Sequence, residues 1–144
     1  MKTKLRNFVK DDIKQIAQIE KQSFIKPWNE NMLLQEYDNP LFNCTVCIDE
    51  NIIAGYINYH IIADEYDIDN IAVSKCYQRK GIATMLINNL IDNAQKNKIR
   101  GITLEVGENN SAAISLYNKF GFKAEGRRKN YYKTEDAIIM WKYF

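Results

Sequence analysis

The stretch NIAVSKCYQRKGIATMLINNLI, residues 70–91, decides how this chain folds. Its first four residues complete the β-rich run 66–73, which predicts a strand. From Ile82 onward, apolar residues fall at positions 82, 83, 86, 87, 90, 91 and 94, a helical repeat that ends near Asn97. The stretch therefore predicts a strand, a turn and a helix, the unit from which α/β domains are built.

The residues before this unit predict two short helices and a set of antiparallel strands. A first strand reaches about Val9, Asp11 offers an N-cap to a helix, and Asn29 offers an N-cap to a second one. The runs 41–48, 52–62 and 66–73 then follow one another without a helix between them. Such spacing is typical of an antiparallel meander.

The residues after the unit predict a strand at 102–106, a short helix at 111–119 and two closing strands. Gly121 follows the short helix at the position of a left-handed C-cap. The closing strands, at 122–126 and 136–144, flank the segment RRKNYYKTE, which we interpret as a polar loop. With no repeat or linker in sight, we expect residues 1–144 to form one domain.

Composition limits the class of protein. The chain has 144 residues, of which 46% are hydrophobic, and this favours a packed globular domain. A formal net charge of +2 does not by itself indicate a nucleic-acid partner. No signal peptide and no apolar run of bilayer length is visible, so we expect a cytoplasmic protein without a membrane partner.

The three cysteines are expected to be free thiols. Cys44 and Cys47 form a C-x-x-C pair, but residues three apart in a strand point to opposite faces. Only Cys76 and His60 remain to complete a ligand set, so we expect no zinc or other metal site.

The turn before Ile82 raises an electrostatic question. Arg79 and Lys80 stand at the start of a helix, where positive charge opposes the helix dipole. A bound phosphate or pyrophosphate would reverse that penalty, and Gly81 would let it approach the free backbone amides. The alternative is that both cations are solvated and the glycine only shapes the turn.

Longer motifs carry a family resemblance. Residues 70–87 resemble the acetyl-CoA-binding motif of the GNAT acetyltransferases, in which Gln78, Gly81 and Ala83 match the pattern. Three further segments, 23–30, 103–122 and 127–140, are similar to the ribosomal-protein-alanine N-acetyltransferases of bacteria within that family. The resemblance implies a mixed, mostly antiparallel sheet of about six to seven strands with about four helices.

It also implies acetyl-CoA as the cosubstrate and a set of residues that bind it. The backbone that would pair with the pantetheine belongs to Ile71, Ala72 and Val73. The pyrophosphate would be held by Arg79, Lys80, Gly81, Ile82, Ala83 and Thr84, and Asn110 would touch the cofactor.

Two residues are implied as the catalytic pair. Amide formation needs a base for the protonated amine and a proton for the departing thiolate. By resemblance, Glu105 is the base and Tyr117 is the acid. The alternatives are an exposed strand carboxylate and a tyrosine whose ring packs in the core.

The implied acceptor is the N-terminal alanine of a small-subunit ribosomal protein, attacked directly without a covalent enzyme intermediate. Trp28 and the segment 127–132, with Arg127, Arg128, Tyr131 and Tyr132, match elements that border the acceptor. Other protein N-termini, lysines or small amines are alternative acceptors. A non-catalytic acetyl-CoA sensor and a nucleotide-binding protein are alternatives of another class, and the oligomeric state stays open.

Overall fold

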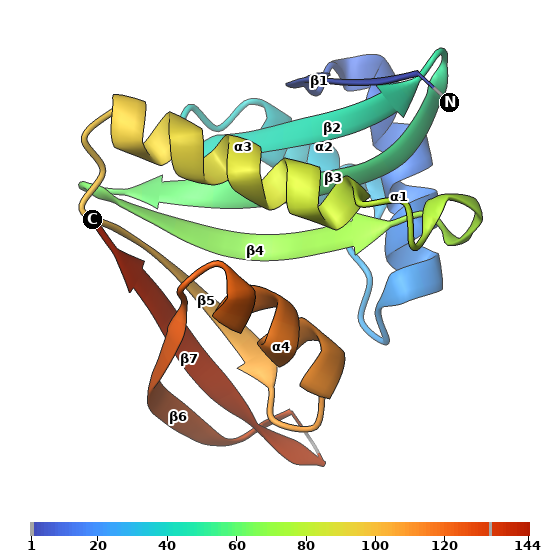
Figure 1. Cartoon of the computed structure of the whole chain (residues 1–144). Helices are drawn as coiled ribbons and strands as arrows, with labels where there is room; N and C mark the ends of the chain where they lie inside the picture. Colours follow the sequence, from blue (N-terminus) through green and yellow to red (C-terminus); the bar gives the residue numbers. More distant parts are fainter. Residues whose placement is uncertain (1, 133) are drawn as a thin grey trace.

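The computed structural model describes residues 2–132 and 134–144 (Figure 1). Its strands are β1 (Thr3–Asn7), β2 (Phe42–Asp49), β3 (Ile52–Ile62), β4 (Glu65–Val73), β5 (Gly101–Gly107), β6 (Lys123–Tyr132) and β7 (Glu135–Tyr143). Its α-helices are α1 (Ile13–Ser23), α2 (Glu30–Tyr37), α3 (Ile82–Lys96) and α4 (Ser111–Lys119). Short 3-10 turns, η1 (Lys10–Asp12) and η2 (Lys75–Tyr77), precede α1 and α3.

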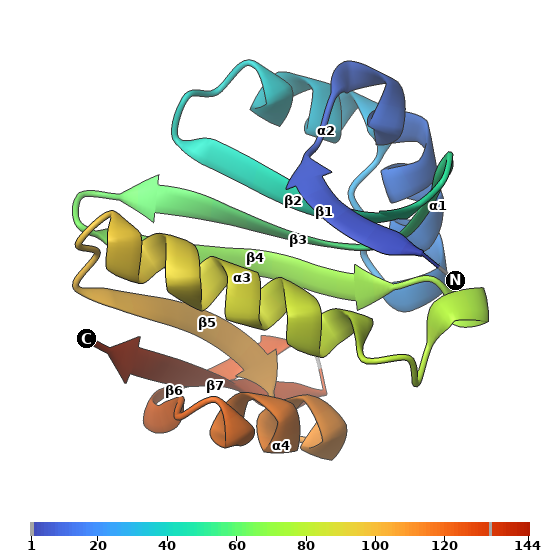
Figure 2. The same ribbon diagram turned by 45° about the horizontal axis from the view of Figure 1, so that its top comes forward.

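The strands form one sheet of seven in the order β1-β2-β3-β4-β5-β7-β6. All neighbours are antiparallel except β4 and β5, which are joined by the crossover helix α3. Helix α3 lies over one face of the sheet, and α1 and α2 lie on the other (Figures 1 and 2). The expected α/β architecture, with a mostly antiparallel sheet and four α-helices, is therefore confirmed.

Each face of the sheet carries its own hydrophobic cluster. The first joins α3 and α4 to the sheet through residues such as Ile57, Leu86 and Tyr117. The second joins α1 and α2 to the sheet through residues such as Ile16 and Leu33. Cys47 belongs to the first cluster and Cys44 to the second, so the expected opposite orientation of the two free thiols is confirmed.

The two parallel strands diverge along their length. The pairing of β4 with β5 runs only from Glu65 and Gly101 to Ile68 and Leu104. Beyond Ile68, β4 stays paired with β3 as far as Val73. Among the described strands, this half of β4 thus has one backbone edge without a partner, and Figure 1 shows β5 turning away from it.

An irregularity lies where the strands part. Asn58 of β3 pairs with Asn70, whereas Tyr59 pairs with Ile68, so Asp69 is an extra residue in β4. Such a β-bulge turns consecutive side chains toward one face of the sheet. Asp69 and Asn70 both contact residues from the side of α1 and α2.

Two local predictions were wrong. The segment 127–132 is not a loop: it belongs to β6, an edge strand that is exposed at every residue, which is why its composition looked like that of a loop. Asp11 does not cap α1, because the turn Lys10–Asp12 precedes the helix. Instead Asp12 accepts a hydrogen bond from the N–H of Val9 at 2.8 Å.

Among the described residues, no helix is long and apolar enough to cross a bilayer.

Candidate active site

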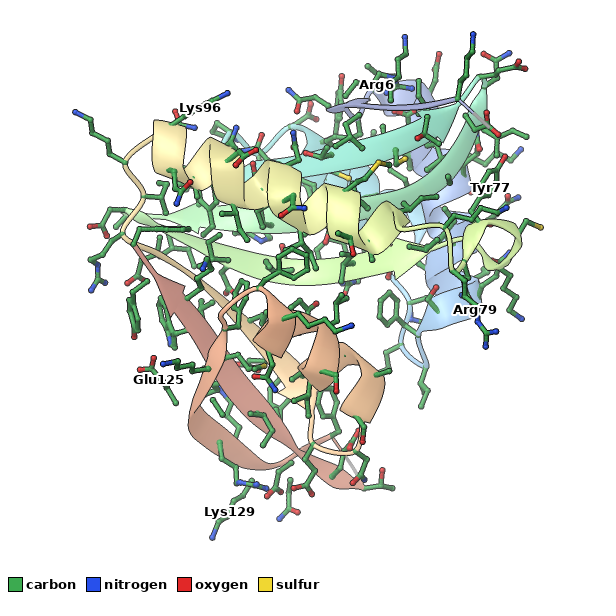
Figure 3. All side chains as sticks on the ribbon, in the orientation of Figure 1. Arg6, Tyr77, Arg79, Lys96, Glu125 and Lys129 are labelled. Carbon is green, nitrogen blue, oxygen red and sulfur yellow. The ribbon has the colours of Figure 1, made fainter. Side chains whose placement is uncertain are left out.

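The turn between β4 and α3 has an unusual backbone. Arg79 and Gly81 both have positive φ, at 64° and 77°. The Gln78 side chain donates to the carbonyl oxygen of Val73, which ties the turn to the end of β4. In Figure 3 the Arg79 side chain points outward from this turn, beside the start of α3.

Close packing holds the start of α3 against the sheet. A Cβ atom added to Gly55 of β3 would lie 2.9 Å from the oxygen of Ala72 and 3.0 Å from Cγ2 of Ile82. A side chain at position 55 would therefore push the turn away from the strands. At Gly81, by contrast, an added Cβ meets no atom within 4 Å, so the space beside the turn is open.

The first amides of α3 lie beside that space, and no hydrogen-bond partner for them is found among the described residues. The first intrahelical hydrogen bond is donated by Met85 to the oxygen of Gly81, and no described side chain caps the helix. Helix geometry leaves the N–H groups before Met85 unpaired. With the dipole of α3 and two exposed cations, these N–H groups fit an anion such as a pyrophosphate.

Glu105 lies on β5 just beyond the last residue that pairs with β4. Ile102, Leu104 and Val106 belong to the cluster under α3 and α4, so Glu105 points to the opposite face. Its Oε1 lies 3.0 Å from Nε of Arg128, and its side chain is 25% exposed. The carboxylate is thus reachable from the face of α1 and α2.

Asp67 of β4 shares this face with Glu105. Burial, together with the negative charge of Glu105, raises the pKa of Asp67 above its usual range. The negative charge of Glu105 is therefore close enough to disfavour ionisation of Asp67.

Tyr117 comes from α4 on the other face of the sheet. It is buried, and its ring lies 5.6 Å from that of Phe122 in an edge-to-face arrangement. Burial raises the pKa of Tyr117 to about 12, so its hydroxyl keeps its proton at neutral pH. At the start of this helix Asn110 accepts a hydrogen bond from the N–H of Ala113 at 3.2 Å and so caps α4.

The lone histidine belongs to a network that the sequence did not reveal. His60 Nδ1 lies 2.6 Å from Asp69, and its Nε2 lies 2.5 Å from Glu36 of α2. Burial raises the pKa of Asp69 to about 7, against the effect of His60. The two carboxylates outweigh burial and raise the pKa of His60. The network therefore joins α2 to β3 and β4 through one histidine.

The residues expected to border an acceptor are only partly brought together. Arg128 reaches Glu105 and also lies over the ring of Tyr131, 5.4 Å from its centroid. Arg127 instead pairs with Glu108 and Asp136 at the far edge of the sheet. Trp28 packs on Phe42, with ring centroids 6.0 Å apart, on the same face of the sheet as Glu105 but in the cluster under α1 and α2.

A carboxylate and a buried phenol thus lie on opposite faces of the sheet, the carboxylate just beyond the last pairing of β4 with β5, and the turn before α3 carries amides that suit an anion. This geometry suits the transfer of a group from a phosphate-bearing carrier and places the protein among the transferases. The chain belongs to the acetyltransferase (GNAT) family, whose model matches residues 13–122. Enzymes of this family use acetyl-CoA, and the chain is an acetyl-CoA-dependent N-acetyltransferase.

Individual relatives agree with this assignment. A Bacillus subtilis protein, provisionally named ribosomal protein bS18-alanine N-acetyltransferase, is 36% identical over 98% of this chain and 97% of its own length. The enzyme of that name from Salmonella typhimurium is 35% identical over 90% of this chain and 89% of its own. The crystal structure of the ribosomal-protein-S18-alanine N-acetyltransferase from Escherichia coli superposes with a TM-score of 0.90 at 30% identity, covering 97% of this chain and 92% of that one.

Proposed function

We propose that this enzyme transfers the acetyl group of acetyl-CoA to the N-terminal alanine of ribosomal protein bS18. The single observation that carries the acceptor is the similarity to relatives named for this reaction, at 35–36% identity over nearly the whole chain. We also propose a cytoplasmic location, where ribosomal proteins are made, and a single domain formed by residues 1–144.

The cosubstrate would lie along β4 and at the start of α3. The unpaired edge of β4 includes Ile71, Ala72 and Val73, whose backbone groups can bind an amide-bearing chain as a further strand would. The free amides at the start of α3 can hold the pyrophosphate. The open space at Gly81 supports this, because the backbone there is accessible to a ligand. The residues proposed for the pyrophosphate are Arg79, Lys80, Gly81, Ile82, Ala83 and Thr84, and Asn110 is proposed to contact the cofactor as well as cap α4.

Acetyl-CoA supplies an acetyl group activated as a thioester. Glu105 would take the proton from the acceptor amine, directly or through a water molecule, as the amine attacks the thioester carbon. Tyr117 would then donate its hydroxyl proton to the departing sulfur. The high pKa of Tyr117 supports this role, because the phenol is in its protonated form at the start of each cycle.

The proposed face for the acceptor is the one that carries Glu105, between Trp28 and β6. Arg128 of β6 lies beside the carboxylate and over the ring of Tyr131, whereas Arg127 is engaged elsewhere. A peptide N-terminus entering there would meet an acidic surface that includes Asp67 and Asp69, which suits a positively charged amine.

A peptide panel tests the proposal. Purified enzyme is incubated with acetyl-CoA and peptides that begin with the bS18 sequence, with other N-terminal residues, or with a blocked N-terminus and an internal lysine. Mass spectrometry then locates the added acetyl group. Preference for the alanine-starting bS18 peptide is expected, whereas acetylation of lysine side chains alone would refute the proposed acceptor. Binding of acetyl-CoA with no transfer to any amine would instead indicate a sensor.

A further inference from the structure

Glu20, near the end of α1, is a charged residue in the interior of the protein. Its exposure is 0%, and it receives hydrogen bonds from three separate parts of the chain. The N–H of Trp28 donates to its Oε1 at 2.8 Å, and Nδ2 of Asn70 donates to its Oε2 at 3.1 Å. The hydroxyl of Tyr56 on β3 donates to the same Oε2.

No described cation lies within ion-pair distance of this carboxylate. Burial raises the pKa of Glu20 above its ordinary value, although its three donors oppose the shift. An unpaired buried carboxylate costs folding free energy even when it is hydrogen-bonded. The stability of the fold therefore does not explain why this position carries a carboxylate, and its hydrogen-bond partners suggest another role.

The partners of Glu20 come from the connection between α1 and α2 and from the strands β3 and β4. Trp28 belongs to the connection between α1 and α2, residues 24–29, which Figures 1 and 2 show beside the carboxyl end of β4. Asn70 follows the bulge of β4, and its own N–H donates to Oδ1 of Asn58 at 2.8 Å. The next residue, Ile71, lies on the unpaired edge of β4.

We propose that Glu20 is a positioning residue for the acceptor: its carboxylate fixes the connection 24–29 on β4 and so sets the distance between Trp28 and the strand that holds the acetyl group. The inference rests on the proposed function for its kinetic consequence. Its structural part, the attachment of the connection to β4, can be measured without any reaction.

The Glu20→Gln variant tests the attachment with almost no change in volume. A carboxamide has one acceptor oxygen and one donor nitrogen. Two donors, Tyr56 and Asn70, meet at Oε2, and the N–H of Trp28 meets Oε1. A carboxamide that keeps its oxygen at the two donors turns its nitrogen toward the N–H of Trp28, so that hydrogen bond is lost. We expect the amide of Trp28 to exchange with solvent roughly tenfold faster or more, which corresponds to the loss of one hydrogen bond to a charged group.

The expected kinetic result is selective. KM for the acceptor peptide should rise roughly tenfold, and KM for acetyl-CoA should stay within about twofold, because the pyrophosphate turn is untouched. The melting temperature should not fall by more than a few degrees, because the variant removes a buried charge.

Asp12→Asn is the matched control. Asp12 is the other buried carboxylate among the described residues, and it also accepts a backbone N–H beside α1. Its ion pair is with Arg6, and this contact does not involve residues 24–29. We expect this variant to lose stability but to keep the acceptor KM and the exchange rate of the Trp28 amide.

Two results would overturn the proposal. One is an unchanged exchange rate of the Trp28 amide in Glu20→Gln. The other is a rise in KM for the acceptor and for acetyl-CoA that is equal in Glu20→Gln and Asp12→Asn, because this would indicate a non-specific effect on the whole structure. If the wild-type enzyme acetylates no N-terminal peptide, the proposed function fails, while the exchange rate of Trp28 still decides whether Glu20 fixes the connection.

Discussion

Replacing Glu105 with glutamine is the most direct test of the proposed base. The change keeps the size of the side chain and removes its charge, so the ion pair with Arg128 is lost. The Arg128 side chain is 56% exposed, and pairs of this kind contribute roughly 0–1 kcal/mol. The melting temperature should therefore change by no more than about 4 °C, and the fold should persist.

The effect on the reaction should be much larger and should depend on pH. Loss of a general base lowers the rate by roughly 10²–10⁴-fold. An α-amino group with a pKa near 8 is only about one-tenth neutral at pH 7 and about nine-tenths neutral at pH 9. Without a base, the variant can use only the amine that is already neutral, so its rate should increase about ninefold from pH 7 to pH 9.

The assay is initial-rate measurement of acetyl transfer to one alanine-starting peptide at saturating acetyl-CoA, from pH 7 to pH 9. Wild-type enzyme, which removes the proton itself, should show a much weaker rise than the variant. Calorimetry should find unchanged affinity of the variant for acetyl-CoA. A variant that retains more than a third of the wild-type rate at pH 7 would refute the assignment of Glu105 as base.

Three other substitutions probe separate features. Gly81→Ala should lower the free energy of unfolding by about 1–2 kcal/mol, because the residue has positive φ although the added Cβ meets no steric clash. The Cβ would also occupy the open space beside the turn and should raise KM for acetyl-CoA. Differential scanning fluorimetry checks the first effect and steady-state kinetics the second. Tyr117→Phe should keep the contact with Phe122 and the melting temperature but lower kcat roughly 100-fold. Because burial raises the pKa of Tyr117 to about 12, the rate of the wild-type enzyme should show no loss from phenol ionisation up to pH 10. Asp12→Asn should lower stability at pH 7 by about 1–3 kcal/mol. Burial alone would raise the pKa of Asp12, but the hydrogen bonds from Arg6 and Val9 lower it, so this stability is present above the unfolded-state pKa and is lost as pH falls through the lower folded-state value. Urea unfolding at pH 7 and at pH 3 should therefore show the difference between Asp12→Asn and wild type shrinking at the lower pH.

The helix that begins at Ile82 and the strand before it could be predicted because their signals are local. Apolar residues at helical spacing predicted α3 to within one residue of its observed end at Lys96. Asn29 and Gly121 were correctly placed at helix ends, since capping depends on residues only a few positions apart. The family resemblance then supplied the architecture and the class of reaction.

Strand β6 shows where local signals fail. Its residues are exposed along the whole strand, so they lack the alternation that marks a half-buried strand. Its pairing with β7 is what makes it a strand, and two register shifts interrupt even that pairing. Arg128 is brought to Glu105 by this strand, a contact that the expected loop gave no reason to predict.

From the sequence by itself came the order of the elements and the turn before Ile82 that is proposed to bind an anion, because periodicity, caps and turn chemistry act over a few neighbouring residues. Only the tertiary structure decided where β4 parts from β5, and which side chains meet there. The carboxylate of Glu20 is 36 residues from Tyr56 and 50 from Asn70 along the chain. Contacts over such separations depend on strand register and helix packing, and no short-range pattern encodes them.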